Sequence, residues 1–222
     1  MTANKISLIW ERLNLEDRRF VDRDYIDRLA HELGSEPIIV VGYLLKMGYL
    51  RRIFKGFFYV STPGDLKMGG QEYSLLEFIS KGLAHKGVSN WYFGLQSALK
   101  LNLMTHEYFT IEYIISDIFR TTKAIPIAGS PVRFYQWTSK LIIPGSIIKK
   151  KTRHGVEIRY SNPEKTVIDL AYWRYTNRLA DCAGPFREYG EQCDQNKLKR
   201  YLDVFPAGFR NSICHDEYAG TR

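Results

Sequence analysis

Residues 35–60 read SEPIIVVGYLLKMGYLRRIFKGFFYV and join a helical pattern to a hairpin pattern without a break. In the first half, apolar residues recur at helical spacing, at Val41, Leu44, Leu45 and Met47. Ser35 is a favourable N-cap, Pro37 is tolerated in the first turn, and Gly48 ends the pattern. The second half, LRRIFKGFFYV, has β-forming residues on both sides of a Lys-Gly turn. We therefore predict a helix that leads directly into a β-hairpin.

Two further helical patterns precede this run. One face of a first helix is formed by Ile6, Ile9, Trp10 and Leu13. A second pattern begins near Asp22 or Asp24, either of which can act as an N-cap, and it ends at Gly34. Three helices followed by a hairpin is the element order of a winged helix-turn-helix, so we predict such a domain over residues 1–62.

The composition changes after the hairpin. Residues 61–72, STPGDLKMGGQE, are rich in Pro and Gly and have no apolar period, which is typical of a linker. Residues 71–222 are then expected to form an α+β domain in which helices flank a small, mostly antiparallel sheet. Its predicted helices cover residues 73–83 and 91–101, start again near Asn162, and end with a last helix at about 194–204. Its predicted strands are 108–111, 125–127, 132–137, 141–143, 147–148 and 156–160.

The composition of the chain also excludes several classes of protein. Its 222 residues suit one or two domains, and a hydrophobic share of 45% is ordinary for a globular protein. No run of about 18 apolar residues is present, so a membrane-spanning helix is not expected. The N-terminus becomes charged too early for a secretory signal. Cys182, Cys193 and Cys214 are few and widely spaced, which favours a reducing, cytoplasmic location over a disulfide framework.

The charge of the chain suits a polyanionic partner, because the net charge is +8. In a helix-turn-helix protein the recognition helix enters the major groove of DNA, and the hairpin of the winged form lies along the phosphate backbone. Cations on the hairpin then supply affinity and salt dependence rather than sequence choice. The DNA-binding residues predicted on this basis are Ser35, Tyr43 and Lys46 on the helix and Arg51, Arg52 and Lys55 on the hairpin.

The predicted recognition helix has few base-reading side chains. Its expected outward residues, which include Glu36 and Ile39, contain no Arg, Asn or Gln for paired hydrogen bonds to a base. Ile39 can contact a thymine methyl, and Glu36 can accept from a cytosine amino group. An alternative is that this apolar helix packs against a protein, which would make the domain an interaction scaffold that does not bind DNA.

Three segments resemble the AbiEi family, the antitoxin and transcriptional regulator of AbiE type IV toxin–antitoxin systems. They are GYLRRIFKGFFYV at 48–60, WYFGLQSALKLNLM at 91–104 and IRYSNPEKTVIDLAYW at 158–173. The first is similar to the family's wing, the second to its Ser-Ala-Leu helix, and the third to its Pro-Glu segment. The resemblance spans residues 5–175 in the order and spacing of the family.

This resemblance implies a DNA-binding N-terminal domain that represses its own operon, so that the operator duplex is a partner. It further implies a second domain that counters a nucleotidyltransferase toxin without forming a stable complex with it.

A short basic run in the second domain is a candidate second contact with a polyanion. It consists of Lys149, Lys150, Lys151 and Arg153. A run of this length is more often a solvated loop, and that explanation stays open beside the polyanion contact.

We expect no enzymatic activity, cofactor or metal site. The chain has no phosphate-binding Gly-rich loop and no paired Cys-x-x-Cys. Glu164 is explained by the dipole at a helix start, and Asp169 is expected to be a buried or capping carboxylate with a basic partner. The enzymatic alternative is a metal-dependent nuclease, for which Glu157 and Asp117 are the nearest candidate carboxylates.

Overall fold

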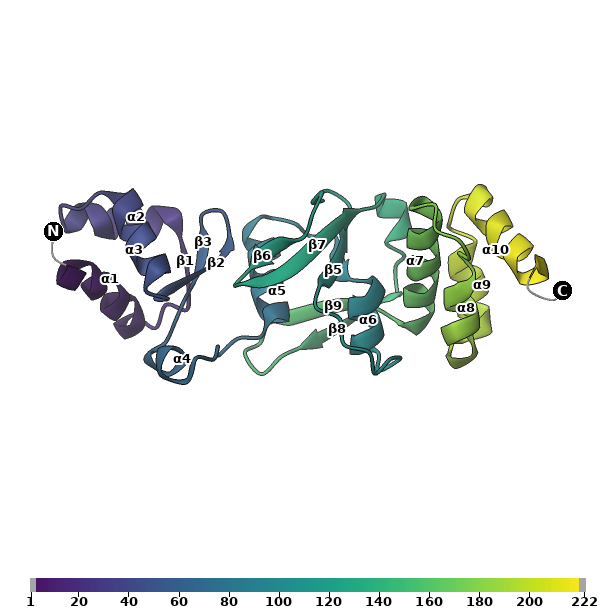
Figure 1. Ribbon diagram of the computed structural model, residues 1–222, viewed down its shortest axis with the longest axis horizontal. Helices are drawn as coiled ribbons and strands as arrows, with labels where there is room; N and C mark the ends of the chain where they lie inside the picture. The colour runs from purple at the N-terminus through teal and green to yellow at the C-terminus, as the bar shows by residue number, and fades with distance from the viewer. Residues whose placement is uncertain (1–2, 220–222) are drawn as a thin grey trace. The chain divides into compact units, whose positions relative to one another are not determined.

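The computed structural model describes residues 3–219, and this part of the chain holds ten α-helices and two β-sheets in a mixed α+β fold (Figure 1). The chain divides into two compact units. The first contains the chain up to Gly87 together with residues 126–130 and 152–156, and the second contains the remainder. No helix in the described range has both the length and the apolar composition needed to cross a membrane.

The first unit begins with three helices and a small sheet. In chain order its elements are α1 (Ala3–Leu15), β1 (Phe20–Asp22), α2 (Arg23–Glu32), α3 (Pro37–Lys46), β2 (Leu50–Phe54) and β3 (Phe57–Val60). The three strands pair antiparallel in the order β1-β3-β2. The predicted helices and hairpin are therefore present, and Asp22 caps α2 by accepting from the Tyr25 N–H at 2.8 Å. Strand β1 was not predicted, because three residues are too short to show a period of two.

The core of this part lies between the helices and one face of the sheet. The helix α3 contributes Val40, Val41 and Leu44 to it, and the sheet contributes Leu50, Phe58 and Val60. Four of the ten residues of α3 are β-branched, which disfavours a helix by intrinsic propensity. Burial of its inner face against α1 and α2 is therefore what holds this segment helical.

The predicted linker is a structured part of the first unit. Helix α4 (Pro63–Met68) lies within it and begins with a capping box between Thr62 and Asp65. Pro63 occupies the first turn, and Gly69, with φ of 67°, ends the helix, so the residues that suggested a flexible linker act as helix-start and helix-stop signals. Helix α5 (Leu75–His85) also belongs to this unit, which places the division after Gly87 rather than within residues 62–71.

The second sheet has six strands, and it is mixed, with both parallel and antiparallel pairs. The strands are β4 (Trp91–Phe93), β5 (Glu112–Ser116), β6 (Ile125–Ile127), β7 (Ser130–Gln136), β8 (Ile147–Lys151) and β9 (Glu157–Ser161), in the order β6-β7-β5-β4-β9-β8. The pairs β4–β9 and β5–β7 are parallel, whereas β4–β5 and β8–β9 are antiparallel. Parallel pairs need long connections, and the β4-to-β9 connection carries most of the other strands.

Three predicted elements of this region were wrong. The predicted helix over 91–101 is divided at Gly94, with β4 before it and α6 (Leu95–Leu101) after it. All three side chains of β4 are buried, so this central strand has no alternation that would distinguish it from a helix. The strand expected at 108–111 lies instead at β5, and the one at 141–143 is replaced by a 3-10 turn, η1 (Ser139–Leu141).

The remaining helices follow the sheet. They are α7 (Pro163–Thr176), α8 (Gly184–Tyr189), the 3-10 turn η2 (Gly190–Gln192), α9 (Gln195–Leu202) and α10 (Ala207–Ala219). Asn162 caps α7 as predicted, by accepting from the Lys165 N–H at 3.0 Å. The helix predicted last in the chain is present as α9, but α10 follows it because buried Phe209 and Ile213 hold that segment against the core. Cys182 and Cys193 are buried, and the side chain of Cys214 lies outside the described residues.

The second unit contains a fully buried ion pair on α7. Lys165 and Asp169 are both 0% exposed, and the ammonium of Lys165 donates to the Asp169 carboxylate. Tyr92 donates to the same carboxylate and accepts from Lys165, both at 2.9 Å. The rings of Tyr92, Trp137 and Phe205 lie 5.2–5.4 Å from the Lys165 nitrogen. The predicted buried carboxylate with a basic partner is confirmed.

Candidate nucleic-acid interface

The outer face of α3 is apolar and open to solvent. Ile38 is 71% exposed and Ile39 is 54% exposed, on the side of the helix opposite buried Val40, Val41 and Leu44. Lys46 is exposed on the last turn. A helix normally turns polar residues outward, so two exposed isoleucines on one turn mark this face as unusual.

Ser35 does not lie on this face. Its side chain is 5% exposed, and its hydroxyl donates to the Leu33 carbonyl at 3.5 Å. Gly34, with φ of 63°, turns the chain so that the Ser35 N–H bonds to Ala30 at the end of α2. The N-cap of α3 is therefore Glu36, which makes no side-chain cap. The predicted role of Ser35 as a cap is wrong, and the burial of its side chain argues against the predicted DNA contact.

Tyr43 is half-buried and belongs in part to an aromatic cluster. Its ring lies 6.4 Å from that of Tyr49, which stacks on Trp10 at 4.6 Å. The indole of Trp10 is fixed by a hydrogen bond of 2.6 Å to the Ser61 carbonyl. Tyr43 is thus a rigid residue at the edge of the outer face.

The two arginines of the hairpin lie on opposite faces of the sheet. Directly opposed residues of an antiparallel pair project from one face, and Arg52 is opposed to Phe58 whereas Arg51 is opposed to Tyr59. Phe58 belongs to the core under α1, α2 and α3, so Arg52 shares the side of the sheet that carries α3. Arg52 is exposed there, and Lys55 is exposed at the turn. Arg51 is half-buried and donates to the Gly70 carbonyl at 3.2 Å.

The arginines between the start of α1 and the end of α2 are mostly paired with carboxylates. Arg12 bonds Glu32 at 2.6 Å, Arg23 bonds Asp27 at 2.6 Å, and Arg19 bonds Asp17 at 2.7 Å. Within residues 3–219, by contrast, no ion pair involves the cations of α3 and the hairpin, which are Lys46, Arg51, Arg52 and Lys55. Their charges are not neutralised by the protein itself.

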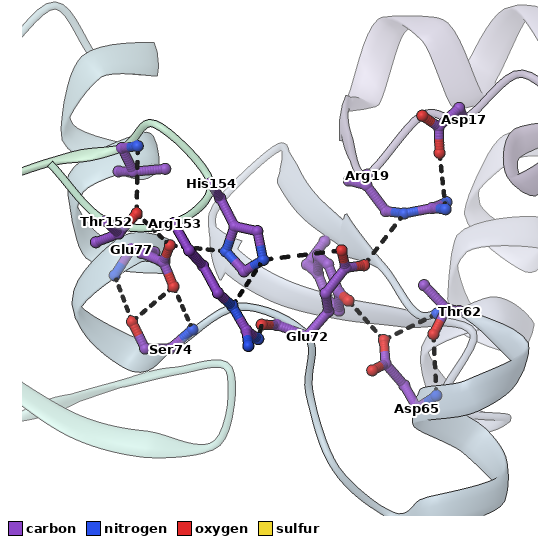
Figure 2. A network of polar contacts seen from close by, with 12 residues as sticks. Asp17, Arg19, Thr62, Asp65, Glu72, Ser74, Glu77, Thr152, Arg153 and His154 are labelled. Carbon is purple, nitrogen blue, oxygen red and sulfur yellow. Dashed lines mark hydrogen bonds and ion pairs between the residues drawn. The ribbon is translucent and has the colours of Figure 1, made fainter.

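The basic run of the second half is divided between the two units. Lys149, Lys150 and Lys151 are exposed on β8, which is an edge strand of the six-stranded sheet. Lysines on an edge strand also prevent pairing with another chain, so their exposure has a structural reason. Arg153 belongs to the first unit and donates to the Glu72 carbonyl at 3.0 Å (Figure 2). Arg153 is exposed but belongs to a different unit from the three lysines, so the four cations do not form one run within a single unit.

A polar network that the sequence did not reveal holds residues 152–154 in the first unit. Figure 2 shows Glu77 at its centre, with Ser74, Thr152 and His154 directed toward its carboxylate. Thr152 donates to it at 2.6 Å, the Ser74 N–H donates at 2.7 Å, and the His154 Nδ1 lies 2.9 Å away. Burial raises the pKa of Glu77, but these hydrogen bonds outweigh burial and bring the pKa to about 2. This network consists of satisfied charges and is a structural feature rather than a binding surface.

The carboxylates of the nuclease alternative are engaged in other contacts. Glu157 forms an ion pair with Arg159 at 2.7 Å, and Asp117 accepts from Asn90 at 2.8 Å. Among the described side chains, no group of three or more His, Cys, Asp or Glu residues is arranged to hold a metal ion.

Comparison with known proteins identifies a fold but no family. Neither a scan against models of protein families nor a search of curated proteins gave a match. Among solved structures, the chain is similar to the RV2827C protein from Mycobacterium tuberculosis, with a TM-score of 0.58 and 14% sequence identity. The similarity covers 99% of this chain and 78% of that chain. At this identity it shows a shared mixed α+β fold alone.

Proposed function

We propose that the first unit is a winged helix-turn-helix that binds duplex DNA, with α3 in the major groove and the β2–β3 hairpin along the phosphate backbone. The order α1, β1, α2, α3, β2, β3 and the antiparallel sheet β1-β3-β2 support this proposal. In this arrangement Lys46 and Tyr43 flank the groove, and Arg52 and Lys55 contact phosphates.

The observation that carries the proposal is the contrast in charge pairing. Arg12, Arg19 and Arg23 are neutralised by carboxylates, whereas among the described residues Lys46, Arg52 and Lys55 are exposed and have no ion pair. Exposed cations without partners repel one another and attract a polyanion, and their counterions are released when phosphates replace them.

We further propose that the chain is a regulator of the AbiEi antitoxin type, which represses its own operon and counters a nucleotidyltransferase toxin. The three segments that resemble that family support this. They form the β2–β3 hairpin, β4 with α6, and β9 with α7, so each lies on structural elements rather than in a loop.

Binding to DNA from upstream of the gene tests the proposed DNA binding and the proposed repression of the chain's own operon. Fluorescence anisotropy is measured with that duplex and with a scrambled duplex, in EDTA, over a range of salt concentrations. Preferential binding to the upstream duplex that weakens steeply with salt is expected. Equal affinity for both duplexes would contradict the repressor role, and cleavage that requires added Mg²⁺ would favour a nuclease.

A second candidate function is a scaffold that binds protein through α3, which the exposed Ile38 and Ile39 favour. It predicts no salt-dependent binding to either duplex. The same titration therefore separates the two functions.

A further inference from the structure

The outer face of α3 is apolar, so it would present hydrocarbon to a DNA groove rather than hydrogen-bond donors and acceptors. Ile38 and Ile39 are exposed at its start, Lys46 at its end, and Gly42 lies between them on the same face. This face contains no Arg, Asn or Gln side chain, which are the groups that form paired hydrogen bonds to guanine or adenine.

Gly42 lies in the middle of this helix without a structural reason inside the protein. A Cβ atom built at this position meets no heavy atom within 4 Å, and φ is not positive. Glycine in a helix interior lowers stability relative to alanine. An exposed glycine that packing does not require is explained when another molecule approaches the helix backbone closely at that point.

The edges of base pairs in the major groove present one apolar group, which is the 5-methyl group of thymine. Contact between a solvent-exposed isoleucine and such a methyl group is favourable, because it removes apolar surface of both the protein and the DNA from water. We propose that α3 selects its DNA by thymine methyl groups, with Ile38 and Ile39 as the contacting side chains and Gly42 as the point of close approach. This inference rests on the proposed DNA binding.

The charges around this face favour DNA over a protein or a second copy of the chain. Lys46 lies on the same helix, Arg52 lies on the side of the hairpin that carries α3, and Lys55 lies at the hairpin turn. None of the three has an ion pair among the described residues. A protein partner that covered the isoleucines would also have to neutralise these cations, whereas the phosphates on either side of a major groove do so directly.

Deoxyuridine provides a direct test, because it pairs as thymine does but lacks the methyl group. The duplex from upstream of the gene is compared with the same duplex in which every thymidine is replaced by deoxyuridine. We expect binding to weaken about 4-fold if one methyl is contacted and about 15-fold if two are, from the transfer free energy of a methyl-sized group. The dependence on salt is expected to stay the same for both duplexes.

Variants separate this inference from DNA binding itself. Ile38→Ala with Ile39→Ala is expected to bind the thymine duplex as weakly as the deoxyuridine duplex and to lose the difference between them. Arg52→Ala is the matched control, and it should weaken both duplexes by the same factor. Salt-dependent binding that ignores the methyl group would overturn the inference and leave the proposed function standing. No binding to either duplex would overturn both.

Gly42→Ala provides an independent readout. It is expected to raise the melting temperature by about 2–4 °C, because alanine favours a helix interior over glycine. It should nevertheless weaken binding to the thymine duplex at least 10-fold, because the added methyl group keeps α3 from the groove. Unchanged affinity in this stabilised variant would contradict the close approach on which the methyl contact depends.

Discussion

Positive charge is unpaired on the surface formed by α3 and the β2–β3 hairpin, but it is paired on the buried face of α7. Lys165 in α7 is 0% exposed and bonds both Asp169 and Tyr92, so every charge there has a partner. Arg52 and Lys55 on the hairpin are exposed, and no ion pair of theirs is found in the described part of the chain. This difference indicates where each cation acts. Lys165 contributes to folding, whereas the hairpin cations are available to a partner outside the protein.

This comparison predicts that removing a cation has an effect that depends on its region. A buried partner left alone lowers stability strongly, because it must either stay charged in a medium of low polarity or take up a proton, and both cost free energy. An exposed cation contributes little to stability, and its loss is felt only in binding.

The largest expected effect is that of Lys165→Ala. It leaves Asp169 buried without its partner, and the free energy of unfolding should fall by about 3–5 kcal/mol. Urea denaturation measures this loss. The double variant Lys165→Met with Asp169→Leu removes both charges and should cost less than the single variant. A single variant that loses less than about 1 kcal/mol would show that the pair is not coupled in the fold.

The next largest effect concerns Glu77, whose pKa of about 2 in the folded protein lies below its ordinary value of 4.5. A pKa that folding lowers stabilises the folded state fully above pH 4.5, and this stabilisation is lost as the pH falls from 4.5 toward 2. Glu77→Gln should therefore lower stability at pH 7 by on the order of 2 kcal/mol and show a flatter pH dependence between pH 4.5 and 2.

Thermal unfolding of both proteins over this pH range measures the effect. Thr152→Val is a matched control, because it removes one hydrogen bond of 2.6 Å to Glu77 but leaves the carboxylate. The Thr152→Val variant should lose about 1 kcal/mol of its free energy of unfolding at pH 7. Parallel curves for the wild type and Glu77→Gln would contradict the role of the network.

Local signals in the sequence predicted much of the first unit and the start of α7 in the second. Asp22 as the cap of α2, the hairpin around Lys55 and the start of α7 at Asn162 all depend on a few neighbouring residues. Elements that depend on distant partners were missed. Strand β4 is buried on both faces, so its sequence carries no alternation, and β1 exists because β3 offers it an edge.

The candidate site shows the same limit. The sequence identified the hairpin cations, but the faces of Arg51 and Arg52 depend on the pairing with Tyr59 and Phe58, which only the tertiary structure supplies. Ser35 was misplaced for a related reason, because the turn at Gly34 moves the start of α3 to Pro37. Pro and Gly in residues 61–72 are compatible both with a flexible linker and with the ends of helix α4. The helix forms because this segment packs within the first unit.

The smallest expected effect distinguishes the two arginines of the hairpin. Arg52→Ala removes an exposed cation on the α3 side and should weaken DNA binding about 5-fold, with a salt slope shallower by about 1. Arg51→Ala is its matched control, because Arg51 lies on the other face and bonds the Gly70 carbonyl, so its affinity should change less than 2-fold. Both variants should keep their stability to within about 0.5 kcal/mol. Anisotropy titrations at several salt concentrations measure the two slopes. Equal slopes for both variants would mean that the phosphate backbone does not approach from the α3 side, and the arrangement proposed for the hairpin would then be wrong.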